Sequence, residues 1–279
     1  MTDPLRFPVY IPTKGRPEKQ LTARNLLRVG IVPTLVVSED EVDVYKRLQP
    51  DCHVIAFPPS YMDDYERTPE LDPHPTTGAA HNFIWDHARA GGYSHHWSID
   101  DNIHTFHYRN THGRVLSHPG PDPFIWHENL MLRYRNLAGF ALGLGHTFGA
   151  SPFSLNTRLY CAVLFRNDLD QYGIKWRRGL NDDTIVSLDI LKTRYWCTAE
   201  SHMLLAYKIG TSRGVRLEGG MTDFYAQGGF IRKAAEAIRV HPDCVRQVVR
   251  YGRVHHQIDY SQFTQRLIPE DQDAAQAAV

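Results

Sequence analysis

Residues 97–103 read Trp97-Ser98-Ile99-Asp100-Asp101-Asn102-Ile103, an apolar run that two adjacent carboxylates and an amide cut short. Two ionised carboxylates side by side repel each other and are costly to bury without a cation. A divalent metal would relieve this cost, and oxygen ligands of this kind suit Mg²⁺ or Mn²⁺. Because Asp and Asn also favour turns, the stretch by itself indicates either a turn or a metal site.

The segments before this stretch alternate between two patterns. Apolar, β-prone runs occupy residues 7–11, 34–37, 53–57 and 93–99, and helical patterns occupy residues 18–29, 41–48 and 78–90. Such alternation predicts a parallel sheet with helical crossovers. Asp100 would then lie at the carboxyl end of the fourth strand, where ligands bind in open α/β sheets, and this position favours a site over a simple turn. The expected fold class is α/β, with a mixed, mainly parallel Rossmann-like sheet flanked by helices.

A second acidic cluster, Asn181-Asp182-Asp183, opens a segment with helical spacing at 184–193. It follows an apolar strand pattern at 159–165, and an amphipathic pattern at 122–144 predicts a further helix. An N-cap explains one aspartate at a helix start but hardly explains two. The cluster therefore indicates either a doubly acidic cap or a second part of the site.

A basic, Gly-rich loop follows the strand pattern at 194–208. Glycine lets backbone amides approach an anion, and arginine binds phosphate bidentately. Arg213, Arg216, Gly219 and Gly220 are therefore candidates for phosphate contact, against the alternative of a solvated connector.

The composition limits the classes of function. The 31 basic and 31 acidic side chains cancel, which excludes the global positive field of a strong non-specific nucleic-acid binder. No apolar run approaches the roughly 20 residues that span a bilayer and no signal segment is evident, so we expect a cytoplasmic protein with no membrane partner. The four cysteines form no CxxC pair, which indicates reduced core residues.

The order of these features resembles the nucleotide-sugar glycosyltransferases of the GT-A fold. Among them it resembles the TET-associated glycosyltransferases of bacteriophages, which act on oxidised bases in DNA. The segments that carry the resemblance are Tyr10-Ile11-Pro12-Thr13-Lys14-Gly15-Arg16-Pro17, Asp100-Asp101-Asn102-Ile103, Asn181-Asp182-Asp183, Gly219-Gly220-Met221-Thr222-Asp223 and the stretch from His241-Pro242-Asp243 to Tyr251-Gly252-Arg253-Val254-His255-His256. We expect a single domain over residues 1–265, with a nucleotide-sugar-binding half at 7–103, an acceptor-binding and catalytic half at 104–265, and a disordered tail at 266–279.

The resemblance implies a UDP-sugar donor and a Mn²⁺ or Mg²⁺ ion that stabilises the departing diphosphate. The metal ligands would be Asp100, Asp101 and Asn102, with His255 or His256 completing the shell unless these histidines are structural. Asn102 replaces a frequent third aspartate of the family, which bears on metal affinity. The donor-binding residues would be Pro12, Thr13, Lys14, Gly15, Arg16, Glu39, Asn82, Asp100, Arg213, Arg216, Gly219 and Gly220.

The resemblance also implies an acceptor, the hydroxyl of 5-hydroxymethylcytosine in DNA. A carboxylate must take the proton of this hydroxyl as it attacks, and Asp183 is the first choice for that base, with inversion at the sugar. Asp182 stands where the family usually has glutamate, which leaves open whether Asp182 or Asp183 is the base. Tyr108 and Arg109 are candidates for acceptor binding. The alternatives are a glycan, lipid or protein acceptor, or a non-catalytic module that binds nucleotide or DNA.

Overall fold

The computed structural model describes residues 4–66, 77–110, 112–145, 147, 149–208, 228–250 and 252–270. Within these residues the strands are β1 (Val9–Pro12), β2 (Thr34–Ser38), β3 (His53–Phe57), β4 (His95–Ile99), β5 (Ile103–Arg109), β6 (Val115–Ser117), β7 (Leu137–Leu144), β8 (Phe153–Leu155), β9 (Ala162–Arg166), β10 (Cys197–Lys208), β11 (Val245–Arg250) and β12 (Arg253–Ile258). The helices are α1 (Leu21–Arg28), α2 (Val42–Leu48), α3 (Ser60–Asp63), α4 (Thr77–Ala90), α5 (Asp122–Met131), α6 (Asp182–Lys192) and α8 (Gly229–Val240), with 3₁₀ turns at Glu39–Glu41 and Leu169–Tyr172.

A ten-stranded sheet forms the centre of the described chain, in the order β3-β2-β1-β4-β9-β7-β10-β5-β6, with β8 beside β10. β3, β2, β1 and β4 are parallel to one another. β9 lies antiparallel between β4 and β7, so β7 and its parallel neighbour β10 point the same way as β4. The expected α/β class with a mixed, mostly parallel sheet is confirmed.

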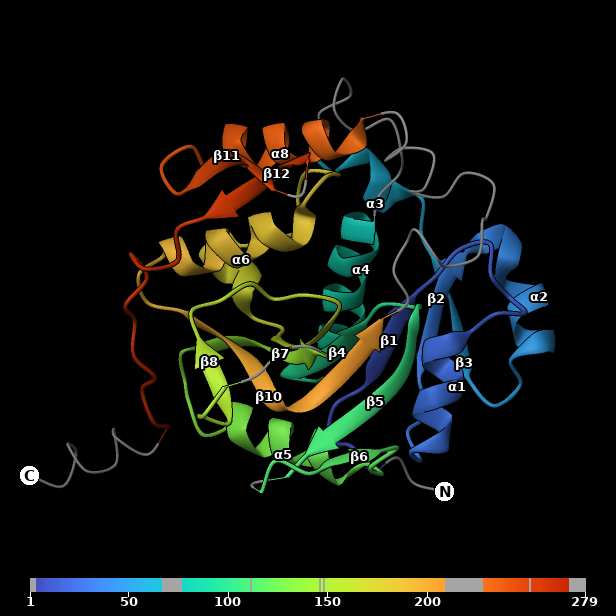
Figure 1. Cartoon of the computed structure of the whole chain (residues 1–279). Coiled ribbons are helices and arrows are strands. Elements are labelled where there is room, and N and C mark those ends of the chain that lie inside the picture. The colour runs from blue at the N-terminus through green and yellow to red at the C-terminus, as the bar shows by residue number, and fades with distance from the viewer. Residues whose placement is uncertain are drawn as a thin grey trace, which may run out of the picture.

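Helices cover both faces of this sheet (Figure 1). Successive side chains of a strand point to opposite faces, so Ile11 of β1 packs with Leu26 of α1 while Tyr10 packs with Ile84 of α4. α5 adds to the first face and α6 to the second, through the core clusters that contain Phe124 and Val186. α8 and the separate β11–β12 ribbon lie beyond α6, at the top of Figure 1.

The strand directions bring several chain ends to one edge of the sheet. β1, β4 and β10 all point toward this edge, which therefore receives the loop after Pro12, Asp100 after β4 and Lys208 at the end of β10. β9 runs the opposite way, so the residues before it reach the same edge, and Asp100 N donates to the Cys161 carbonyl at 2.7 Å. The topology alone thus gathers residues that are far apart in the sequence.

Two expectations from the sequence need adjustment. The helix expected over 122–144 is α5 followed by the buried strand β7, because the Ala- and Gly-containing run of β7 is covered on both faces and lacks the alternation of a half-buried strand. The first residues of the expected tail are held by the body: Asn136 donates to the Arg266 carbonyl and accepts from Ile268 N. Residues 271–279 lie outside the described part.

Candidate active site

Asp101 fastens the loop that follows β1. Its Oδ1 accepts from Arg16 Nη1 at 2.8 Å, and its Oδ2 accepts from Thr13 Oγ1 at 2.8 Å. Gln20 strengthens the loop by donating to Thr13 Oγ1 and to the Arg16 carbonyl. Burial raises the pKa of Asp101, and the Arg16 charge opposes that rise. Both oxygens of this carboxylate are therefore used to hold the loop expected to meet the nucleotide.

Glu41 provides a second tether for the same loop. Its Oε1 accepts from Gly15 N at 2.7 Å, and Glu41 is the last residue of the 3₁₀ turn that follows β2. The sequence pointed to Glu39 as the acid after this strand, and Glu39 is exposed. Lys14 and Gly15 are also exposed, whereas Pro12 is buried as the last residue of β1.

Asp100 forms an ion pair with Lys208. Lys208 Nζ donates to Asp100 Oδ2 and to Tyr160 Oη at 3.2 Å, and it lies 4.7 Å from the centre of the Tyr160 ring. Burial alone would lower the pKa of Lys208, but the Asp100 carboxylate raises it well above the ordinary value. The ammonium is therefore charged at any physiological pH and held at the strand ends.

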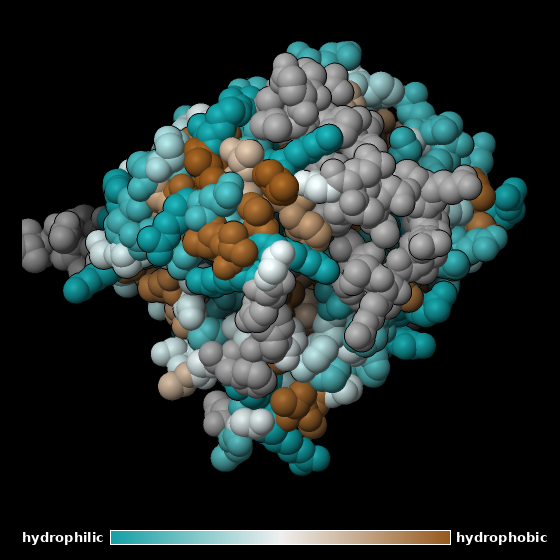
Figure 2. Space-filling view, turned by 45° about the horizontal axis from the view of Figure 1, so that its top comes forward, coloured by the Kyte–Doolittle hydropathy of each residue, from teal (hydrophilic) through white to brown (hydrophobic). Residues whose placement is uncertain are grey.

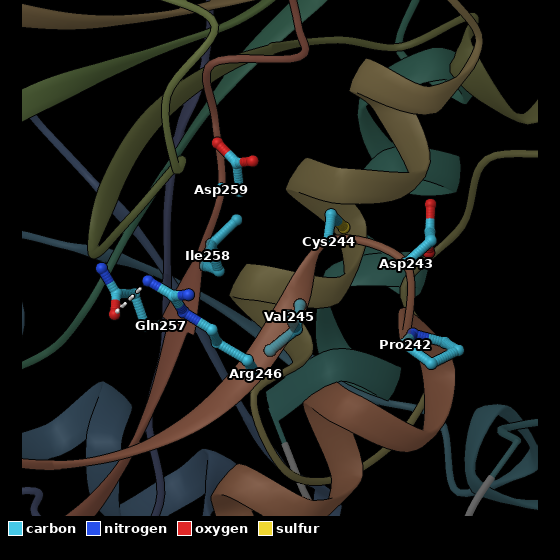
Figure 3. Close-up of a pocket in the computed structure, with 8 residues that line it drawn as sticks. All are labelled: Pro242, Asp243, Cys244, Val245, Arg246, Gln257, Ile258 and Asp259. Atoms are coloured by element: carbon cyan, nitrogen blue, oxygen red, sulfur yellow. Dashed lines mark hydrogen bonds between the residues drawn. The ribbon is translucent and has the colours of Figure 1, made fainter.

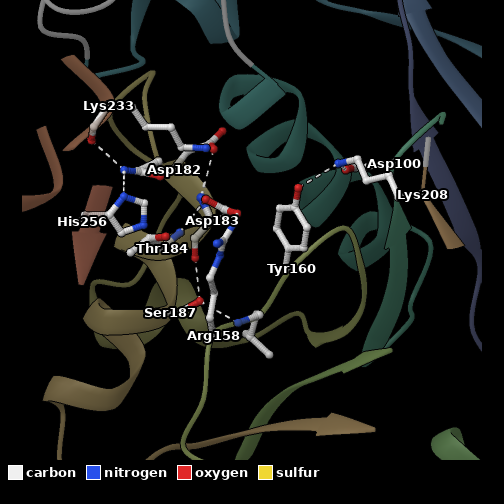
Figure 4. A network of polar contacts seen from close by, with 12 residues as sticks. Asp100, Arg158, Tyr160, Asp182, Asp183, Thr184, Ser187, Lys208, Lys233 and His256 are labelled. Atoms are coloured by element: carbon white, nitrogen blue, oxygen red, sulfur yellow. Dashed lines mark hydrogen bonds and ion pairs between the residues drawn. The ribbon is translucent and has the colours of Figure 1, made fainter. Parts of the chain in front are cut away.

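Tyr160 separates this ion pair from the second acidic cluster (Figure 4). On its other side the Arg158 guanidinium lies 4.1 Å from the ring centre. Arg158 Nε donates to Asp183 Oδ2 at 3.0 Å, and Nη2 donates to the same oxygen. The two acidic clusters are thus joined through one aromatic ring and two cations.

Asp182 and Asp183 differ in their environments, although both begin α6. Asp183 Oδ1 accepts from Thr184 N at 2.8 Å, so each of its oxygens has a partner. Burial would raise the pKa of Asp183, but the Arg158 charge lowers it below its usual range. For Asp182, burial and then the charge of Asp183 raise the pKa to about 7. One carboxylate is a held anion and the other can exchange a proton near neutral pH.

Asn181 links this cluster to the β11–β12 ribbon. It adopts a left-handed conformation (φ 60°), and its Nδ2 donates to the Lys233 carbonyl at 2.6 Å and to His256 Nδ1 at 3.3 Å. Burial, with the Arg158 and Lys233 charges, lowers the pKa of His256 to about 4. His256 therefore meets the start of α6, and its neighbour His255 points to the opposite face of the ribbon.

α4 contributes two polar residues on the far side of the cluster. His81 stacks on Trp176 with 4.1 Å between ring centres, and its Nδ1 lies 2.9 Å from Ser98 Oγ. Burial lowers the pKa of His81 to about 4, against the charges of Asp100 and Asp183. Asn82 donates to the Trp176 carbonyl and accepts from Trp176 N, so it fixes the backbone at Trp176, on which His81 stacks.

Two further predicted residues, Tyr108 and Arg109, are not brought to these acids. They lie at the last residues of β5, whereas Ile103, which pairs with Lys208, is the first residue of that strand, roughly 17 Å away along it. Arg213, Arg216, Gly219 and Gly220 lie outside the described residues.

Three residues of the cluster were missed in the sequence: Arg158, Tyr160 and Lys208. Each is next to an apolar strand run, Lys208 at the end of β10 and the other two just before β9. In the sequence each is a charged or aromatic residue at a strand end. Such a residue can be assigned to the site only when the directions of β9 and β10 in the sheet are known.

The expected metal ligands do not form a metal site within the described part of the chain. Across those residues no group of three or more His, Cys, Asp or Glu side chains is placed to hold a metal ion. Asp101 is committed to Arg16 and Thr13, Asp100 faces Lys208, and His256 lies with Asn181. The donor set that the resemblance implies does not fit the residues as they lie.

A pocket of about 400 Å³ opens at the base of the ribbon (Figure 3). It is lined by Pro242, Asp243, Cys244, Val245, Arg246, Gln257, Ile258 and Asp259. None of these residues belongs to the two acidic clusters, so the pocket is separate from the candidate active site.

No helix in the described stretches is long and apolar enough to span a bilayer.

Comparison with known proteins gives one family match. The family model described as TET-Associated Glycosyltransferase matches residues 7–214, which include both acidic clusters. No curated protein matches the chain. Among solved structures, 4-diphosphocytidyl-2C-methyl-D-erythritolsynthase from Anaerococcus prevotii DSM 20548 is similar, with a TM-score of 0.41 and 10% identity over 82% of this chain and 95% of that one. That likeness is too distant to carry an argument.

Proposed function

The chain belongs to the TET-associated glycosyltransferase family, and on that premise we propose that it transfers a sugar from a UDP-sugar to the hydroxyl of 5-hydroxymethylcytosine in DNA. It is a glycosyltransferase, and such an enzyme needs a nucleotide-sugar donor. The choice of uridine and of the DNA acceptor is the proposal.

One observation carries the proposal: a group of basic side chains and a pair of carboxylates lie side by side at one edge of the sheet. The loop held by Asp101, with Lys208 beside Asp100, offers positive charge for a diphosphate. Across the Tyr160 ring, Asp182 and Asp183 offer carboxylates for an acceptor hydroxyl. A sugar held between these two groups would have its leaving group on one side and its attacking oxygen on the other.

The different environments of the two aspartates support different roles for them. Asp182 takes the proton of the hydroxymethyl group, because burial and the Asp183 charge raise its pKa towards neutrality. Asp183 stays ionised and keeps Arg158 in place. As the acceptor oxygen bonds to the anomeric carbon, the bond from that carbon to the diphosphate oxygen breaks, and the configuration inverts. No step is assigned to a metal, because the described residues do not fit one.

The local charge of one segment supports a DNA acceptor. The whole chain is neutral, yet residues 228–258 contain Arg232, Lys233, Arg239, Arg246, Arg250 and Arg253 against Glu236 and Asp243. Glu236 pairs with Arg239 and Asp243 pairs with Lys192, so these acids are already compensated. Such segregated positive charge suits a polyanion.

The register of the ribbon decides which of its residues face outward. Val245 and Ile258 pack with residues of α6 and α8, so this face is inward and includes His256. Arg246, Arg250 and Arg253 alternate with them and are exposed. In Figure 2 the surface that includes this region is mostly hydrophilic around small hydrophobic patches. The ribbon therefore joins a basic outer face to the start of α6.

The direct test is incubation of the full chain with a panel of UDP-sugars and DNA containing 5-hydroxymethylcytosine, followed by mass spectrometry of the nucleosides. A hexose or pentose adduct on the modified base is the expected result, with cytosine DNA and the Asp182→Asn variant as matched controls. Release of UDP without an adduct would move the acceptor to a glycan, lipid or protein. Absence of both adduct and UDP binding would contradict the proposal.

A further inference from the structure

We infer that this enzyme binds the diphosphate of its donor without a divalent metal, with the ammonium of Lys208 in the place of the cation. The inference rests on the proposed nucleotide-sugar donor and concerns how that donor is held. It follows from the partners of the strand-end acids and the reach of Lys208.

The acidic side chains at this edge already have other partners. A metal at this edge would need several oxygen ligands that face one point. Asp101 turns both oxygens toward Arg16 and Thr13, at 2.8 Å each. Asp100 remains, and its Oδ2 accepts from Lys208. One carboxylate that already faces an ammonium is a poor metal site.

The geometry of Lys208 suits a phosphate oxygen. The Lys ammonium has three N–H donors, and Asp100 Oδ2 and Tyr160 Oη accept two of them. Among the residues that the structure describes, these two are its acceptors, which leaves the third donor for a further acceptor. The side chain is 18% exposed, which lets a phosphate oxygen approach. The Tyr160 ring and Asp100 hold the ammonium still, so its direction is set before the donor arrives.

The charge balance also favours a fixed cation at this edge. A nucleoside diphosphate that leaves the sugar carries additional negative charge, which a fixed cation stabilises. Arg16, whose side chain is 32% exposed at the same edge, provides a second cation beside Lys208.

The test compares UDP binding by calorimetry, in EDTA and then in Mn²⁺, for the wild-type chain and the variants Lys208→Met, Lys208→Arg and Lys175→Met. Lys175 is an exposed lysine outside the cluster and serves as the matched charge control. We expect wild type and Lys175→Met to bind UDP equally in both media. Lys208→Met should bind about 10- to 100-fold more weakly in both, as for the loss of a charge-assisted hydrogen bond, and Lys208→Arg should recover part of the affinity.

A further variant and a metal readout guard against simple misfolding. Asp100→Asn combined with Lys208→Met removes both charges of the pair, so no buried carboxylate is left alone, and it should bind UDP as weakly as Lys208→Met. Electron paramagnetic resonance should show Mn²⁺ remaining free in the presence of wild type and UDP.

Stoichiometric Mn²⁺ binding, or UDP binding that EDTA abolishes and Mn²⁺ restores, would overturn the inference. If binding depends on Lys208 in EDTA and yet no DNA base is modified, the inference stands and the acceptor proposal fails. If UDP does not bind in either medium, both fail.

Discussion

The Arg158 guanidinium directs both Nε and Nη2 to a single oxygen of Asp183, and Thr184 N donates to the other. Asp182, one residue earlier, accepts from Asp183 N at 3.0 Å and from the Thr77 hydroxyl at 3.4 Å. Adjacent aspartates at one helix start therefore have unlike partners, a guanidinium for one and neutral groups for the other. This difference leads to the first two predictions.

Asp182→Asn should lower kcat by about 10²- to 10⁴-fold, the range that a general base contributes, with little change in UDP affinity. Asp183→Asn should instead lower the thermal stability, because it leaves the partly buried Arg158 guanidinium without its carboxylate. Sugar transfer, UDP binding and the melting temperature are measured for both variants. Full activity of Asp182→Asn beside an inactive but stable Asp183→Asn would exchange the two roles.

The pH dependence of kcat/KM should report the ionisation of Asp182. The base must be ionised to accept a proton, and burial raises its pKa to about 7. The rate should therefore fall tenfold per pH unit as the pH drops below about 7. Lys208 does not titrate in this range, since its pKa is raised from a value that is already high. A rate that stays constant from pH 8 to pH 5 would contradict the assignment.

Much of the fold could be predicted because β2, β3 and β4 are short apolar runs separated by helical patterns. Parallel strands covered on both faces have this appearance, and their carboxyl ends share an edge. Asp100 could thus be assigned to the site from the sequence, and so could the acids that begin α6. The family resemblance read from the same motifs is confirmed by the family match.

The partners of these acids could not be predicted in the same way. Lys208 and Asp100 are more than a hundred positions apart and meet only because β9 reverses the direction between β4 and β7. The sequence of β7 predicts a helix, since a fully buried apolar run has no diagnostic period. Asp101 holds the loop after β1 because Arg16 and Thr13 of that loop donate to it. The spacing of these residues in the sequence does not predict these contacts.

Buried histidines should make the protein sensitive to mild acid. Burial lowers the pKa of His81, His95 and His127 to about 4 and that of His96 to about 3. Below pH 6.5 the unfolded chain therefore binds protons that the folded chain does not, so the free energy of unfolding falls as the pH falls from about 6.5 toward 4.

The slope of this fall reaches at most about 1.4 kcal/mol per pH unit for each histidine. Denaturant unfolding at pH 7.5, 6.5 and 5.5 measures it, and unbuffered unfolding at pH 5.5 should take up protons from the solution. Equal stability at pH 7.5 and 5.5, with no proton uptake, would show that these histidines are protonated in the folded state.

The basic outer face of the ribbon predicts how binding to DNA responds to salt. Arg246 and Arg250 are exposed on β11, on the face opposite His256. Each arginine that contacts a phosphate contributes about 0.9 to the slope of log K against log salt for duplex DNA, because it displaces condensed cations. The double variant Arg246→Gln with Arg250→Gln should therefore lower that slope by roughly 2 and weaken binding of modified and unmodified DNA alike.

The matched control is Arg28→Gln with Arg47→Gln, which removes two exposed arginines from α1 and α2, on the other side of the molecule in Figure 1. It changes the net charge by the same amount, so a general loss of positive charge would affect both double variants equally. We expect the control to keep the wild-type slope and both variants to keep UDP affinity. A slope lowered equally in the two would show that DNA does not lie along the ribbon, while leaving the donor side of the site untouched.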